Sequence, residues 1–191
     1  MIVDINTLNP TGSIEMNLFS WEVPENLPVQ EFKYASPKKV LDSIPEDMAQ
    51  LVQRMIDEIR KYDSRSIVVD YRVRNLTTGD SGSQIYGYHL DCTNDIHDDF
   101  EPETHIIFGT VQGTSFIMNP INSIGYNTVE DILQNEVLVE CIAPTGTAHK
   151  YTSKVLHNCP LIENPCQRLL IRVTAGFRER IEHVKSLSNQ A

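Results

Sequence analysis

The sequence predicts a mainly β protein, an antiparallel barrel or sandwich with flanking helices. Between residues 66 and 176 it contains short β-branched segments of alternating character, separated by Gly, Pro and Asn. One amphipathic helical segment precedes this region, and a second helical segment follows it. The chain has 191 residues, 40% of them hydrophobic, which fits one domain with one core.

The first third of the chain is predicted to pack against that core. Residues 1–45 are irregular and contain five prolines, so we expect an arm or short edge strands there. Apolar residues then recur at three- and four-residue spacing from Met48 to Ile59, which predicts a helix with one buried stripe. Ser43, with Glu46 three residues later, is the predicted N-cap. Residues 1–65 therefore form an arm and a helix.

The middle and the end of the chain supply the strands and two further helices. Strands are predicted at residues 66–74, 84–91, 104–110, 114–118, 136–143, 148–155 and 166–176. A short helix is predicted at 128–136, and the segment 177–191 carries a terminal helix over 177–187. The intervening loops 76–83, 91–104 and 119–135 are expected to select the substrate.

Charge and cysteine content exclude several classes of protein. Sixteen Lys and Arg against 26 Asp and Glu give a net charge of −10, which disfavours nucleic acid and anionic membrane surfaces as partners. No apolar run is long enough for a membrane-spanning helix, and the first residues show no signal-peptide pattern, so a cytoplasmic protein is expected. The four cysteines form no CxxC pair, which predicts free thiols and no structural zinc site.

Three residues form a candidate metal site. His89 and Asp91 lie two apart at the end of a predicted strand, so their side chains should point to the same face. His157 follows 66 residues later and should come from a late strand that lies beside the first. Two imidazoles and one carboxylate on one side of a metal leave positions open, as in non-haem Fe(II) oxygenases.

The last predicted strand adds a candidate anion site. Alternation places Arg168, Leu170 and Arg172 on one face of CQRLLIRV. Two arginines inside a barrel need an anion to pair with, and a guanidinium grips a carboxylate with two hydrogen bonds. A dicarboxylate cosubstrate would meet that need.

Taken in order, these segments resemble those of one enzyme family. HLD (89–91), IIFGTVQGTSFI (106–117), VLHNCP (155–160) and QRLLIRV (167–173) are similar to the Fe(II)- and 2-oxoglutarate-dependent oxygenases. The resemblance covers residues 66–176 and implies a double-stranded β-helix (jelly roll). It implies Fe(II) held by His89, Asp91 and His157, with 2-oxoglutarate as cosubstrate and its distal carboxylate on Arg168. The implied reaction hydroxylates a substrate and releases succinate and CO2.

Two positions qualify the resemblance. The family often has Ser or Thr two residues after the arginine, where this chain has Leu170, so Arg172 is the alternative anchor for 2-oxoglutarate. Halogenating relatives replace the metal-binding carboxylate with a small residue, whereas Asp91 is present here, which favours hydroxylation.

Several alternatives stay open from the residues alone. His149 is the main rival of His157 as a ligand, and His97 and His105 also compete. Arg72 and Arg74 are predicted to be exposed, with support of substrate binding as the alternative for Arg72.

The function also has rivals from other classes. The second hypothesis is a non-catalytic cupin-like or degenerate jelly-roll binding module, which Leu170 favours slightly. The third is an interaction protein that uses its proline-rich residues 1–45. Neither the substrate, which ranges from a small molecule to a protein side chain or a nucleobase, nor the oligomeric state is predicted.

Overall fold

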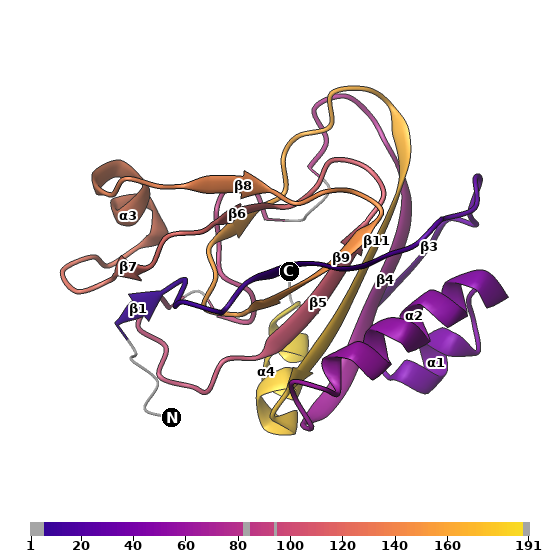
Figure 1. Ribbon diagram of the computed structural model, residues 1–191, viewed down its shortest axis with the longest axis horizontal. Helices are drawn as coiled ribbons and strands as arrows, with labels where there is room; N and C mark the ends of the chain where they lie inside the picture. Colours follow the sequence, from indigo (N-terminus) through magenta and orange to yellow (C-terminus); the bar gives the residue numbers. More distant parts are fainter. Residues whose placement is uncertain (1–5, 82–84, 94, 189–191) are drawn as a thin grey trace.

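The protein is built mainly of antiparallel β-sheet. The computed structural model describes residues 6–81, 85–93 and 95–188. Its largest sheet has six strands in the order β2-β9-β5-β11-β4-β3, a second sheet has the order β10-β6-β8, and a third pairs β1 with β7. Helices α1 and α2 cover one side of the large sheet, and the three-stranded sheet lies on its other side (Figure 1).

The strands differ greatly in length. They are β1 (Thr7–Leu8), β2 (Glu15–Ser20), β3 (Gln30–Ala35), β4 (Ser66–Leu76), β5 (Thr104–Gly109), β6 (Ser115–Ile117), β7 (Ile121–Asn122), β8 (Glu140–Ile142), β9 (Thr147–Thr152), β10 (His157–Asn158) and β11 (Cys166–Gly176). The two longest, β4 and β11, pair along their whole length, from Cys166 opposite Leu76 to Gly176 opposite Ser66. This antiparallel pairing is the longest in the large sheet.

Four helices accompany the strands: α1 (Pro37–Leu41), α2 (Glu46–Ile59), α3 (Val129–Asn135) and α4 (Arg178–Ser188). The long helix α2 is the predicted one, but its N-cap is Pro45 and not Ser43. The Ser43 hydroxyl instead donates to the carbonyl of Lys39, because a short helix that the sequence did not predict ends just before it. Within the described residues, no helix has the length and apolar character needed to cross a membrane.

The main apolar core lies between α2 and the large sheet. The side of α2 from Met48 to Ile59 is fully buried against alternate residues of β11 and the other central strands. From β11 these are Leu169, Ile171, Val173 and Ala175, each at most 2% exposed. The residues between them point to the opposite side, toward the three-stranded sheet.

The predicted edge strands of the first 45 residues are confirmed. β2 and β3 form the two edges of the six-stranded sheet. The predicted strand at 84–91 is wrong: residues 82–84 lie outside the described chain, and in the rest the only strand-like pairing is a bridge between His89 and His157. Positive φ angles at Gly87 (79°) and at Cys92 (64°) turn the backbone away from an extended path on both sides of this bridge.

Candidate active site

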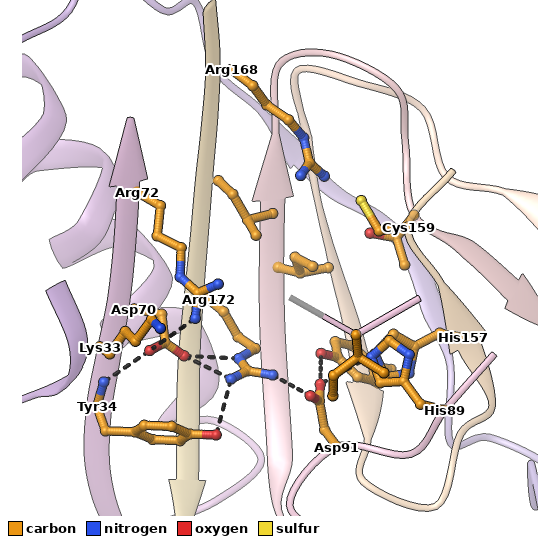
Figure 2. Close-up of a pocket in the computed structure, with 15 residues that line it drawn as sticks. Lys33, Tyr34, Asp70, Arg72, His89, Asp91, His157, Cys159, Arg168 and Arg172 are labelled. Carbon is orange, nitrogen blue, oxygen red and sulfur yellow. Dashed lines mark hydrogen bonds and ion pairs between the residues drawn. The ribbon is translucent and has the colours of Figure 1, made fainter. Parts of the chain in front are cut away.

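The inner face of the large sheet carries polar and charged side chains. Strand alternation turns Asp70 and Arg72 of β4, together with Arg168 and Arg172 of β11, toward the three-stranded sheet. They line one pocket, which also receives residues of the loop before β5 and of β10. Figure 2 shows this pocket, with Arg168 and Asp91 at opposite ends of the view.

His89, Asp91 and His157 converge at one end of this pocket. Each offers one ligand atom, and these atoms lie within 4.8 Å of one another. The bridge that joins His89 and His157 is held by two backbone hydrogen bonds of 3.0 and 3.1 Å, so the rings meet with centroids 4.4 Å apart. The convergence was expected from strand alternation, but the bridge and the turn at Cys92 produce it.

Hydrogen bonds fix the tautomer of both histidines. Nδ1 of His89 lies 2.9 Å from the carbonyl oxygen of Gly87, and Nδ1 of His157 lies 2.9 Å from that of Val155. A carbonyl only accepts, so each Nδ1 carries the proton and each Nε2 of a neutral ring keeps a free lone pair. Burial lowers the pKa of His89 to about 4, which keeps that ring neutral at pH 7. Both rings thus present the nitrogen that a metal requires.

Asp91 is buried and ionised. Burial by itself would raise its pKa, but the Arg172 guanidinium holds the pKa well below its usual range. Arg172 forms an ion pair with Oδ1, while the Tyr151 hydroxyl donates to Oδ2. Nε2 of His157 lies 3.4 Å from the same Oδ2. The carboxylate therefore keeps one orientation beside the two imidazoles.

Arg172 joins Asp91 to a second buried carboxylate. Its Nε and Nη2 donate to Oδ2 of Asp70 at 3.0 and 2.8 Å, and the backbone N–H of Tyr34 donates to Oδ1 at 2.8 Å. Tyr34 has a positive φ of 44° at an irregularity in β3, which turns its ring toward the pocket. Both carboxylates that line the pocket are thus already engaged by Arg172.

Arg168 has no such partner. Arg168 is buried, and its Nε donates to the carbonyl of Val111 at 3.1 Å. No carboxylate of the described residues lies within ion-pair distance of its guanidinium. Thr114 lines the pocket beside it. The preceding residue must be a glycine, because a Cβ on Gly113 would lie 1.6 Å from the carbonyl oxygen of Ala143. Arg168 and Thr114 together offer donors to an anion.

The rival histidines have other partners. Nδ1 of His149 accepts from the backbone N–H of Asn17 at 3.2 Å, and its Nε2 donates to the carbonyl of Pro144 at 2.9 Å. Nε2 of His97 lies 2.9 Å from the carbonyl of Tyr126. His105 is fully buried with Nδ1 against the Thr174 hydroxyl at 2.9 Å, and burial lowers its pKa to about 3. None of the three joins the cluster of His89, Asp91 and His157.

The pocket is basic although the chain is acidic. Four basic side chains line it, Lys33, Arg72, Arg168 and Arg172, against two acidic ones, Asp70 and Asp91. The expected exposure of Arg72 is wrong, since its side chain is 13% exposed and lines this pocket. Arg74, 25% exposed, pairs with Glu31 at 2.6 Å. A net positive, partly enclosed pocket favours an anionic ligand.

Tyr151, Asp70 and Thr114 were missed by the sequence reasoning. Tyr151 and Asp70 lie in segments that were predicted as strands. Alternation places Asp70 on the same face as Arg72, but it does not show that Asp70 lies opposite Arg172. No sequence signal distinguished Tyr151 or Thr114 from ordinary strand and turn residues. Cys159 also lines the pocket, as one of four half-buried free cysteines.

Comparisons with known proteins add little to this geometry. No model of a protein family matches the sequence, and no curated protein matches it. Among solved structures, the chain is similar to EvdO2 from Micromonospora carbonacea var. aurantiaca, with 14% identity and a TM-score of 0.44, over 81% of this chain and 69% of that chain. A likeness of this degree assigns neither a family nor an activity.

Proposed function

We propose that the protein is an Fe(II)- and 2-oxoglutarate-dependent dioxygenase that hydroxylates a substrate and releases succinate and CO2. The observation that carries the proposal is one pocket in which two imidazoles and a carboxylate converge at one end, while an arginine without a carboxylate partner lines the other end. A metal at one end and a carboxylate anchor at the other are what a bidentate 2-oxo acid with a distal carboxylate requires.

The order of the strands supports a double-stranded β-helix over residues 66–176. Along the chain, segments alternate between the two facing sheets: β4 is in the large sheet, the bridge at His89 joins the small one, and β5 returns to the large one. β6 and β8 then belong to the small sheet, β9 to the large, β10 to the small and β11 to the large. We take residues 1–65 and 177–191 as additions to this core within one domain.

The residues present fit an iron ion. His89 and His157 offer Nε2 and Asp91 offers Oδ2, and the second nitrogen of each ring already donates to a backbone carbonyl. Three protein ligands on one side would leave the remaining positions to small molecules. When bound, the iron would supply the chemistry that couples decarboxylation of the 2-oxo acid to oxidation of the substrate by O2.

Arg168 is the residue that would hold the distal carboxylate of 2-oxoglutarate. Arg172 is the poorer candidate, because its guanidinium is committed to Asp70 and Asp91. Thr114 lines the same pocket and would supply a hydroxyl in place of the one that the family often has at the position of Leu170. A charge-assisted pair with an added hydroxyl donor gives both affinity and a defined orientation.

Arg172 and Tyr151 would act as positioning residues. Arg172 holds Oδ1 of Asp91 and Tyr151 donates to Oδ2, so the carboxylate is oriented before a metal binds. The Tyr151 ring also packs on that of His157, with centroids 5.1 Å apart.

The test is the visible absorption band that Fe(II) and 2-oxoglutarate produce together under anaerobic conditions. The wild type should show the band, and Asp91→Ala should abolish it while the protein stays folded. Asp99→Ala is the matched control, because it removes an exposed carboxylate from the same segment. A folded wild type without the band, or an Asp91→Ala protein that keeps it, would contradict the proposal.

A second candidate is the non-catalytic binding module on the same scaffold. The observation that favours it is Leu170, which places an alkyl group in the pocket where a hydroxyl is common in the family. A protein of this kind would bind a small anion without any dependence on Fe(II). The absence of the band together with anion binding would identify it.

A further inference from the structure

The inner face of β4 and β11 carries more positive charge than one distal carboxylate needs. The register of the two strands places Arg168 opposite Arg74 and Arg172 opposite Asp70. Arg72 lies between these pairs, opposite Leu170. Like charges that face each other across neighbouring strands are unfavourable unless anions lie between them.

The carboxylates nearby are already used by other groups. Asp70 accepts two hydrogen bonds from Arg172 and one from the backbone of Tyr34. Glu31 of β3 accepts from Arg74 at 2.6 Å. Arg72 is left with longer contacts, 3.5 Å from Nε to Oε1 of Glu31 and 4.0 Å from Nη2 to Oδ1 of Asp70.

Arg72 is therefore a guanidinium that lacks a close partner. Its Nε is buried and makes no hydrogen bond. Burial, followed by the neighbouring Arg172, lowers its pKa, although Asp70 opposes this. A buried donor without a partner is costly in a finished structure, so a ligand that supplies an acceptor would be bound there.

We propose that Arg72 marks a second oxyanion subsite of the pocket, which binds a carboxylate or phosphate group of a small-molecule substrate. This inference rests on the proposed function in one respect, that Arg168 is reserved for the cosubstrate. The guanidinium groups of Arg72 and Arg168 come from neighbouring strands and line one pocket (Figure 2). Lys33 lines the same pocket, with its Nζ 3.7 Å from Oε1 of Glu31.

The subsite favours an oxyanion over a neutral group for a physical reason. The planar guanidinium offers paired N–H donors that match the two oxygens of a carboxylate or phosphate. A hydroxyl or amide of a neutral substrate would satisfy one donor and leave the excess charge in the pocket. The net charge of −10 for the whole chain opposes a large polyanion, so a small molecule is the expected ligand.

The test measures binding of small oxyanions to metal-free protein by titration calorimetry. The probes are inorganic phosphate and acetate, which separate the two sources of an oxyanion. All measurements use an Arg168→Gln background, so that the anchor proposed for 2-oxoglutarate does not contribute. In this background at least one probe should bind, and adding Arg72→Gln should weaken its binding by about tenfold or more.

The matched control adds Arg178→Gln to the same background. It removes one exposed arginine from α4, whose partner is Glu182, and it should change binding by less than about threefold. Equal losses for the two double variants would overturn the subsite, as would a complete loss of binding in Arg168→Gln alone. If Arg72→Gln does not fold, Arg72→Lys replaces it. Lysine keeps the charge without the paired donors, so unchanged binding of both probes would then also overturn the proposal.

Failure here and failure of the proposed function give different results. Oxyanion binding that depends on Arg72, in a protein without the Fe(II)–2-oxoglutarate band, would support the subsite and reject the oxygenase. The band together with oxyanion binding that ignores Arg72 would support the oxygenase and reject the subsite. The two measurements are independent because the calorimetry contains no metal.

Discussion

The two faces of β11 carry different kinds of side chain, apolar toward α2 and charged toward the pocket. Toward α2 the strand presents Leu169, Ile171 and Val173, all buried in the main core. Toward the pocket it presents Arg168 and Arg172, which are also largely buried but carry charge. Apolar burial stabilises the fold, whereas burying the arginines costs solvation free energy that only paired anions offset. The same strand therefore contributes apolar side chains to the core and the arginines beside which an anion would bind.

The largest change in the free energy of unfolding is expected from a substitution on the apolar face of β11. Ile171→Ala should lower the free energy of unfolding by about 2–5 kcal/mol, because it leaves a cavity at a fully buried position between α2 and the sheet. Urea unfolding of the metal-free protein measures the change. The same variant, at a temperature where it is folded, should keep its affinity for 2-oxoglutarate. An altered affinity would show that the two faces are not separate.

A smaller effect on the free energy of unfolding is expected from pH. It arises from His105, on the pocket side of β5. His105 has an ordinary pKa near 6.5 when unfolded, and burial lowers the pKa to about 3 in the folded protein. Between these two pKa values the unfolded chain binds a proton at His105 that the folded protein does not bind. The free energy of unfolding therefore falls as the pH drops below 6.5. His105 alone should remove about 2 kcal/mol between pH 7 and pH 5.

Comparing His105→Phe with the wild type isolates this contribution. Phenylalanine keeps a ring against Tyr151, which lies 4.8 Å from the imidazole by ring centroids, and it cannot titrate. The loss of stability from pH 7 to pH 5, measured by urea unfolding of metal-free protein, should shrink by about 2 kcal/mol in the variant. An unchanged loss would mean that His105 is protonated in the folded state.

The smallest effect is expected at Leu170, where the enzymes of the proposed class often have a hydroxyl side chain. Leu170→Ser restores that group beside Arg168, where Leu170 now lines the pocket. A neutral hydrogen bond contributes about 0.5–1.5 kcal/mol, so the affinity for 2-oxoglutarate should rise about two- to tenfold. Titration of the anaerobic absorption band measures this, with Leu170→Ala as the control for lost side-chain volume. A gain that the alanine variant shares would come from volume and not from the hydroxyl.

Sequence periodicity predicted the apolar face of β11 and the helix that packs on it well, but it predicted the pocket side only in part. The strand at 166–176 and the buried stripe of α2 are confirmed, because both depend on short-range periodicity. The structure brings the three residues of the candidate metal site together, but the predicted strand at 84–91 is wrong. Positive φ angles at single residues, such as Cys92, decide that path, and periodicity does not encode them.

Residues that act through pairing register were out of reach of the sequence. Asp70 is significant because β4 and β11 pair so that it lies opposite Arg172. Tyr151 reaches Asp91 across sixty positions of sequence, from a strand that looked ordinary. Arg72 and Arg74 follow one alternation, yet only Arg72 lines the main pocket, because Glu31 of β3 pairs closely with Arg74. Such choices require the neighbouring strand to be known.

The central claim is that one pocket joins a metal site to a carboxylate anchor, and Arg168→Gln tests it most directly. The dissociation constants of Fe(II) and of 2-oxoglutarate would be measured separately under anaerobic conditions, with Arg178→Gln, at an exposed position of α4, as the matched control. The predicted result is Fe(II) affinity within about threefold of the wild type and 2-oxoglutarate affinity reduced by about tenfold or more in Arg168→Gln alone. Unchanged 2-oxoglutarate affinity in that variant would contradict the account.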